Sequence, residues 1–169
     1  DMGCVALLHS CGDALTPTSS QWSAVNKVPV ISSPNANTKV TIENFSDYFW
    51  NCGTKGAWSV GKLCAIDAVS RGYTSFSYVG KDGAACQDAI TFLQWEGQKL
   101  NPDFHIVDDY RVSDGDFTAV VSAVMSSHPD MVLEQGAGAT FVSFMQAAQQ
   151  FDLPAEIPVY DDFAADSST

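Results

Sequence analysis

The chain has 169 residues, enough for one ordinary domain, and its composition of 46% hydrophobic and 17% charged residues predicts a packed core rather than disorder. Its formal net charge is -12 and its 8 Lys and Arg residues form no cluster, so nucleic acid and anionic membrane surfaces are excluded as expected partners. No apolar run approaches the roughly 20 residues of a membrane-spanning helix, so we expect no membrane insertion of this segment.

Strand and helix patterns alternate from the beginning of the chain. Short apolar runs such as CVALLH and VPVIS are typical of strands, and a longer segment with apolar residues at helical spacing ends at Gly72, a typical helix stop. The expected buried residues of that helix are Val60, Leu63, Cys64 and Ala68. The elements expected up to residue 72 are strands at 4–9, 28–32 and 48–51 and helices at 16–25 and 57–71.

The alternation continues to the end of the chain. Asp116 is the expected N-cap of one helix, because its carboxylate can accept the free N–H groups of the first turn. Polar and apolar residues alternate in the second half of the run at 105–112, which predicts a strand near a sheet edge. The expected strands are 75–80, 105–112, 131–134 and 157–162, and the expected helices are 87–100, 117–127 and one through 141–148. The apolar stripes of these helices are Ile90, Leu93 and Gly97, then Phe117, Val120, Val121, Val124 and Met125, then Phe141, Phe144, Met145 and Ala148.

Repeated β-α units of this length predict the α/β class, with doubly wound parallel sheets and right-handed crossovers. In such sheets ligands bind outside the carboxyl ends of the strands. The segments that follow the expected strands here are small, polar or acidic, and rich in glycine, so they are where we expect function. They are His9–Leu15, Ser33–Asn37, Gly80–Ala85, Gly136–Gly138 and Asp161–Asp162.

Motifs for cofactors and metals are weak or absent. The GAGATF segment at Gly136 lacks the full GxGxxG pattern, and the sequence contains neither a GxxxxGK[ST] phosphate loop nor a GxSxG elbow. The cysteines have no CxxC or Cys/His metal spacing, and their odd number leaves at least one unpaired. They are Cys4, Cys11, Cys52, Cys64 and Cys86. We expect no cofactor and no metal, and disulfide pairing stays open.

Two groups of residues leave catalysis open. His9 lies near Cys11 at the end of the first strand, and a Cys-His pair there could act as a nucleophile and its base. Asp161 and Asp162 end the last strand, where an acidic pair could bind an ammonium group, contribute to a metal site, or simply be solvated. An α/β enzyme using either pair is therefore an alternative hypothesis.

The order of the segments resembles the type I periplasmic solute-binding proteins, the leucine/isoleucine/valine-binding family. GCVALLHSCGDALTPTSSQWSAVNKVPVISSPNANT is similar to the last β-α-β unit of that family's first lobe, and the segment beginning YFWNCGTKGAW to its crossing into the second lobe. The most specific match is SDGDFTAVVSAVMSSHPDMVLEQGAGATFVSFMQAAQQFDL, which is followed by IPVYDD. The resemblance covers essentially the whole chain.

The resemblance implies non-catalytic capture of a small organic solute, an amino acid or a similar carboxylate or amide, in a cleft between two lobes. It also implies delivery to an ABC permease and a periplasmic or extracellular location. Two-lobed members are much longer, so the chain is expected to be a fragment. It would comprise the end of lobe one at 1–48, a hinge crossing at 49–53, and most of lobe two at 54–169.

By position, the resemblance assigns ligand contacts to small residues of lobe one, to the junction, and to a wall and an acid of lobe two. These are Ala14, Leu15, Thr16, Asn35, Ala36 and Asn37, then Lys55 and Trp58, then Ala85, Ala137, Gly138, Asp161 and Asp162. The sequence departs from the family pattern in having alanine where an aromatic wall is common, which implies a roomier pocket. A ligand-sensing ectodomain of the same fold is a further alternative.

Overall fold

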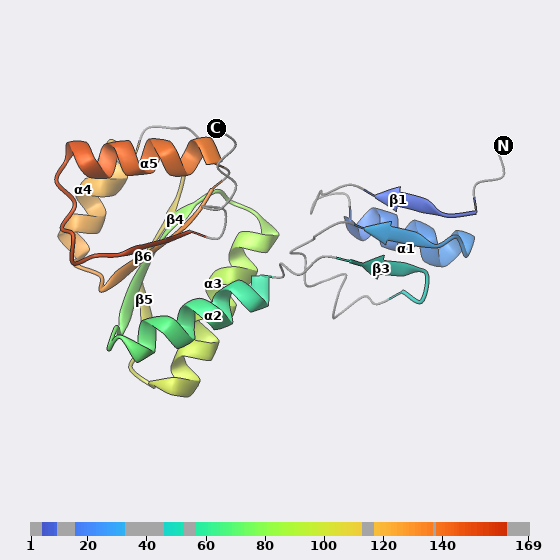
Figure 1. Ribbon diagram of the computed structural model, residues 1–169, viewed down its shortest axis with the longest axis horizontal. Coiled ribbons are helices and arrows are strands. Elements are labelled where there is room, and N and C mark those ends of the chain that lie inside the picture. Colours follow the sequence, from blue (N-terminus) through green and yellow to red (C-terminus); the bar gives the residue numbers. More distant parts are fainter. Residues whose placement is uncertain are drawn as a thin grey trace. The chain divides into compact units, whose positions relative to one another are not determined.

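The computed structural model describes residues 5–9, 16–32, 46–52, 57–112, 117–136 and 138–161 of the chain (Figure 1). The chain divides into two compact units, Asp1–Val60 and Gly61–Thr169. Strands and helices alternate, except that the strand Val30–Ser32 is followed by the strand Phe49–Asn51 as the next described element, and every strand pair among the described residues is parallel. The predicted α/β class with parallel sheets is therefore confirmed.

The first unit contains a three-stranded sheet in the order β1-β2-β3, with α1 against one face. Val30 and Phe49 form the buried core on that face, while the register aligns Leu8, Ile31 and Trp50 on the other, where all three are exposed. The elements are β1 (Leu7–His9), α1 (Thr16–Asn26), β2 (Val30–Ser32) and β3 (Phe49–Asn51). All four were expected, although β1 and β2 are shorter than their apolar runs.

The second unit contains a four-stranded sheet in the order β5-β4-β6-β7. The central strand β4 is buried throughout, whereas β5 lies at an edge and is partly exposed, as its alternating sequence predicted. The elements are α2 (Ala57–Ser70), which belongs to this unit from Gly61 on, β4 (Ser75–Gly80), α3 (Ala84–Leu100), β5 (His105–Arg111), α4 (Thr118–Ser127), β6 (Met131–Gln135), α5 (Gly138–Gln150) and β7 (Val159–Asp161).

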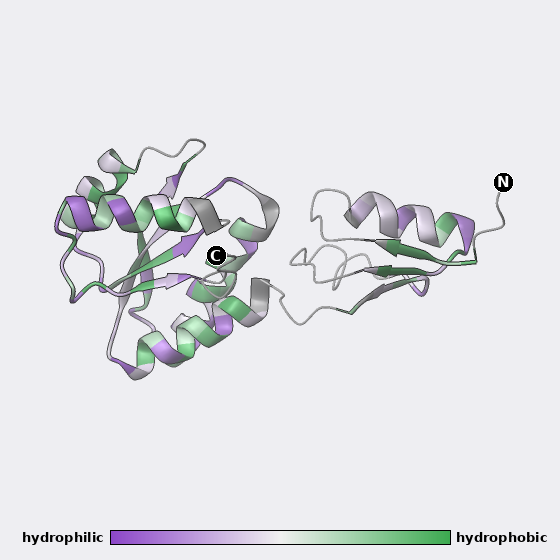
Figure 2. Ribbon diagram, turned by 45° about the horizontal axis from the view of Figure 1, so that its top comes forward, coloured by the Kyte–Doolittle hydropathy of each residue, from purple (hydrophilic) through white to green (hydrophobic). Residues whose placement is uncertain are grey.

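Each face of this sheet has its own hydrophobic core. Phe76 and Leu133 pack with buried residues of α2 and α3 on one face, and Val79 and Val132 pack with α4 and α5 on the other. Coloured by hydropathy, the helices show alternating hydrophobic and hydrophilic bands, as amphipathic helices do (Figure 2). The stripes predicted for α3 and α4 are confirmed, with Phe117 packing edge-on against Phe144 of α5.

Three details of the helices were predicted wrongly. The helix α4 has Phe117, not Asp116, at its N-cap position, and Asp116 lies outside the described residues. Leu63 and Met145, expected to be buried, are 67% and 38% exposed. Leu63 is exposed because another face of α2 packs against α3. That face consists of small residues such as Gly61, since the two helices are too close there for a larger side chain.

The amino edge of the four-stranded sheet is held together by Asp130. Its Oδ2 accepts hydrogen bonds from the amide and hydroxyl of Thr74, at 2.7 and 3.0 Å, and from the amide of Ser75, at 2.9 Å. The Ser75 hydroxyl accepts the amide N–H of Asp130 in return. Burial raises the pKa of Asp130, but the hydrogen bonds from Thr74 and Ser75 outweigh it, so that the pKa lies below its ordinary value.

The edge strand β7 is tied to α2 through a tyrosine. The Tyr160 hydroxyl donates to Oδ2 of Asp67, which also accepts a hydrogen bond from Nε of Arg71 at 2.7 Å. These bonds, first that from Arg71 and then that from Tyr160, lower the pKa of Asp67. Because the Arg71 and Asp67 side chains are 58% and 42% exposed, this ion pair is a surface salt bridge and contributes little to stability.

Candidate functional site

The carboxyl ends of all four strands of the second unit meet at one edge of its sheet. Gly80 of β4 is in register with Arg111 of β5 and with Gln135 of β6, and Asp161, the last residue of β7, is in register with Glu134, one position before Gln135. In parallel α/β sheets this edge is where ligands bind. It is therefore the candidate site of this unit.

Two carboxyl groups lie on neighbouring strands of this edge. Glu134 of β6 and Asp161 of β7 are paired in register and so face the same side of the sheet. Glu134 is fully buried and Asp161 is partly buried. A Cβ on Gly136 would lie 2.6 Å from Oε1 of Glu134 and 2.5 Å from the Thr140 side chain. The glycine after β6 is thus required chiefly by the Thr140 side chain, whose Cβ cannot rotate away, with the buried glutamate also in contact.

The other half of the edge is formed by Arg111, which the sequence analysis did not single out. Its Nε and Nη2 donate to the two carboxylate oxygens of Asp109 at 2.5 and 2.8 Å. The same Nη2 donates to Oε1 of Gln87 in α3 at 3.0 Å. The hydrogen bonds to Asp109 are the main cause that raises the pKa of Arg111, so its guanidinium stays charged at every physiological pH. The only signal in the sequence was its position in a strand two residues after Asp109, which places both side chains on the same face of that strand.

Some of the predicted site residues are described with their side chains, some with their backbone alone, and others lie outside the described residues. Thr16, Trp58, Ala85 and Gly138 all lie in the first turns of helices, where the backbone but not the side chain is described. Asp161 is described in full, and His9 ends β1 with its side chain undescribed. The predicted residues that lie outside the described part are Cys11, Ala14, Leu15, Asn35, Ala36, Asn37, Lys55, Ala137 and Asp162.

Ala85, Gly138 and Asp161 are brought to the same edge of one sheet by the topology. Ala85 follows β4, Gly138 follows β6, and Asp161 ends β7, so each lies at a carboxyl end. Their role as ligand contacts stays a prediction.

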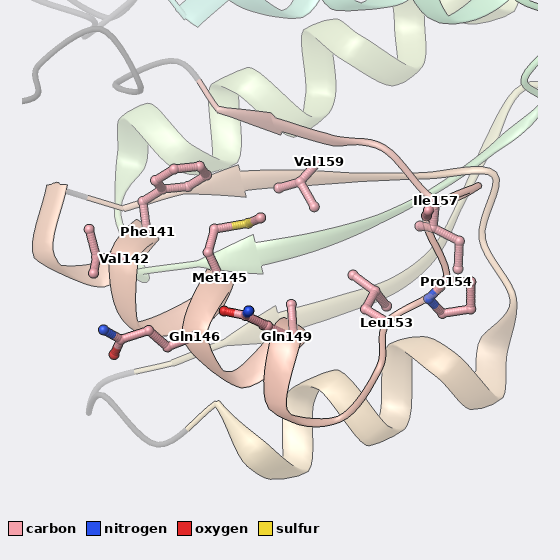
Figure 3. Close-up of a pocket in the computed structure, with 11 residues that line it drawn as sticks. Phe141, Val142, Met145, Gln146, Gln149, Leu153, Pro154, Ile157 and Val159 are labelled. Atoms are coloured by element: carbon pink, nitrogen blue, oxygen red, sulfur yellow. The ribbon is translucent and has the colours of Figure 1, made fainter.

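A groove of about 610 Å³ runs alongside α5 rather than across the carboxyl edge (Figure 3). It is mainly apolar, with Phe141 and Met145 on the helix, Leu153 in the following turn and Val159 on β7, and it includes two glutamine side chains. It flanks the edge strand β7. Because no carboxylate or charged side chain lines it, this groove does not have the polar groups of the predicted solute site.

Neither a metal centre nor a membrane span is found in the described part of the chain. Among those residues, no three His, Cys, Asp or Glu side chains lie where together they could hold a metal ion. None of the described helices has the length and hydropathy needed to cross a bilayer.

Comparison with solved structures shows a shared fold at low identity. A solute-binding protein of an R. palustris ABC transporter, solved in complex with benzoate, matches with a TM-score of 0.80 at 15% identity, over 94% of this chain and 43% of that one. A leucine-binding protein from Thermotoga maritima matches with a TM-score of 0.77 at 18% identity, over 93% of this chain and 44% of that one. A solute-binding protein of Rhodopseudomonas palustris HaA2 in complex with p-hydroxybenzoic acid matches with a TM-score of 0.77 at 18% identity, over 91% of this chain and 42% of that one.

The chain thus spans less than half the length of these similar proteins. No curated protein matches it. The family described as periplasmic binding protein matches residues 1–169, the whole of the chain. The alternating parallel architecture, the glycine-rich carboxyl edge and this match lead to one conclusion: the chain belongs to the periplasmic binding protein family.

Proposed function

We propose that the protein to which these residues belong captures a small organic carboxylate non-covalently and delivers it to an ABC permease. The family match along the whole chain carries this proposal. The similar solved proteins are named as binding benzoate, p-hydroxybenzoic acid or leucine, which all join a carboxylate to an apolar body. A periplasmic or extracellular location belongs to the same proposal.

The carboxyl edge of the second unit supplies the chemistry that such a solute needs. Asp161, with Asp162 next to it in the sequence, would meet a positively charged group such as an ammonium. The small residues Ala85, Ala137 and Gly138 would leave room for the apolar body. In the first unit, the residues from Ala14 to Thr16 and from Asn35 to Asn37 would meet the carboxylate, and Lys55 and Trp58 would complete the contacts.

A titration followed by NMR tests this function on the 169-residue chain, with benzoate and leucine as probes. We expect saturable shifts at amides of the carboxyl edge, such as Gly80 and Gly136, and none at Thr74 on the amino edge. Because the chain spans less than half of the similar proteins, dissociation constants in the millimolar range are expected. A micromolar constant would contradict that expectation, but not the proposed function.

The variant Asp161→Asn separates the two solute classes. Leucine carries an ammonium group and benzoate does not, so the substitution should weaken the binding of leucine and leave the affinity for benzoate unchanged. If neither solute causes saturable shifts at this edge, the proposed function loses its support. If either solute is chemically converted, the enzyme hypothesis replaces it.

A further inference from the structure

The loop between β4 and α3 is held by two side chains that meet at one carbonyl oxygen. The Tyr78 hydroxyl donates to the carbonyl of Lys81 at 3.3 Å, and Nη1 of Arg111 donates to the same oxygen at 3.4 Å. The guanidinium carbon of Arg111 lies 4.6 Å from the centre of the Tyr78 ring. This distance allows a cation–π contact between the two donors. The carbonyl of the first loop residue is therefore fixed from two directions.

The absence of a side chain at Gly80 makes this arrangement possible. A Cβ at that position would lie 2.5 Å from the Tyr78 hydroxyl oxygen and 2.6 Å from the carbonyl oxygen of Gln135. Tyr78 is fully buried, and burial is the main cause that raises its pKa, so the hydroxyl stays protonated and can donate. The glycine thus leaves the space through which the buried tyrosine reaches the loop.

Arg111 connects this loop to two further elements. It is only 22% exposed, and its planar guanidinium spans Asp109 of its own strand, Lys81 of the loop and Gln87 in the first turn of α3. Asp82, also in the loop, adds a distant contact at 3.8 Å but is 91% exposed and contributes little. A guanidinium can make these contacts at once because its five N–H groups form a rigid fork.

We propose that Arg111 is a positioning residue, which fixes the β4–α3 loop and the first turn of α3 at the carboxyl edge so that this segment can contact the solute. The inference rests on the proposed function. It does not require Arg111 to touch the solute, because the guanidinium is already occupied by protein groups. Ala85, a predicted ligand contact, lies in the segment that Arg111 holds.

Amide hydrogen exchange of the 169-residue chain tests the structural half of this proposal without any solute. The variant Arg111→Gln should increase exchange by about tenfold in residues 81–87 and leave the central strand β6 unchanged. Arg111→Lys should not restore protection, since an ammonium cannot span the three acceptors. Arg71→Gln is the matched control, because it removes an ion pair with Asp67 but no loop contact. Equal exchange in all variants, or full rescue by lysine, would overturn the proposal.

Benzoate titration of the same variants tests the functional half. We expect Arg111→Gln to weaken benzoate binding by about threefold to tenfold, while Arg71→Gln binds like the unsubstituted chain. Faster exchange with unchanged benzoate affinity would show that Arg111 orders the loop without serving recognition, and would overturn this half. If the unsubstituted chain binds no benzoate and no leucine, the proposed function fails, whereas the exchange data still decide whether Arg111 positions the loop.

Discussion

Replacing Gly61 by alanine should destabilise the second unit, although alanine is the better helix former. The new Cβ would lie 2.6 Å from the backbone nitrogen of Leu93 and 2.8 Å from Cβ of Phe92. Favourable contacts between such atoms need about 3.5 Å, so α2 and α3 would have to separate by about 1 Å. The obstacle is backbone and Cβ, which cannot rotate away.

The expected cost follows from two opposing effects. Overpacking of a well-packed site costs about 1–3 kcal/mol, and separating the helices also weakens contacts along the interface. The gain from replacing glycine in a helix is at most about 1 kcal/mol. Because the obstacle is backbone, the overpacking cost should lie at the upper end of its range, and after the helix-propensity gain is subtracted Gly61→Ala should lower the free energy of unfolding by about 2 kcal/mol.

Urea unfolding followed by circular dichroism measures this difference. Lys62→Ala is the matched control, because Lys62 is the next residue of the same helix and is exposed. Its effect should stay within about 0.5 kcal/mol. The reasoning is refuted if Gly61→Ala is as stable as the unsubstituted chain or more stable, since helix propensity would then outweigh the contact.

Three further predictions concern other parts of the chain. Asp130→Asn should lower the free energy of unfolding by about 1–2 kcal/mol at neutral pH. The folded-state pKa of this carboxyl is depressed, so its contribution is present above the unfolded value of about 3.9 and is lost as the pH falls through the folded value. The difference from the unsubstituted chain should shrink below about pH 4 in acid-unfolding curves, and a difference that is constant with pH would contradict this. Tyr160→Phe should raise the pKa of Asp67 toward its ordinary value in an NMR titration, because the carboxylate loses one of the two side-chain hydrogen bonds that it accepts. An unchanged pKa would mean that the Tyr160 hydroxyl does not stabilise the carboxylate. Leu8→Thr should change the free energy of unfolding by less than about 0.5 kcal/mol, because Leu8 is 85% exposed. Val30→Thr, at a site that is only 1% exposed, should lower it by about 1–3 kcal/mol. Equal effects of the two substitutions in urea unfolding would show that both faces of the first sheet are covered.

The sequence by itself determined the class of the fold and the order of its elements. Strand-sized apolar runs separated by helical patterns are local features, and parallel pairing follows from the long connections between them. The edge position of β5 was also readable, because a half-exposed strand alternates polar and apolar residues and a central one such as β4 does not. The carboxyl edge could be predicted as the site region for the same topological reason.

Only the tertiary structure decided which side chains meet. Gly61 looks like an ordinary helix-weakening residue until α3 lies against it, and Leu63 looks like a core residue until its face of α2 is seen to be exposed. Arg111 carried no recognisable motif, because its partners other than Asp109 come from a loop and a helix 30 and 24 residues earlier in the chain. Helical spacing assigns residues to a face of one element, but it cannot say how closely a second element approaches that face.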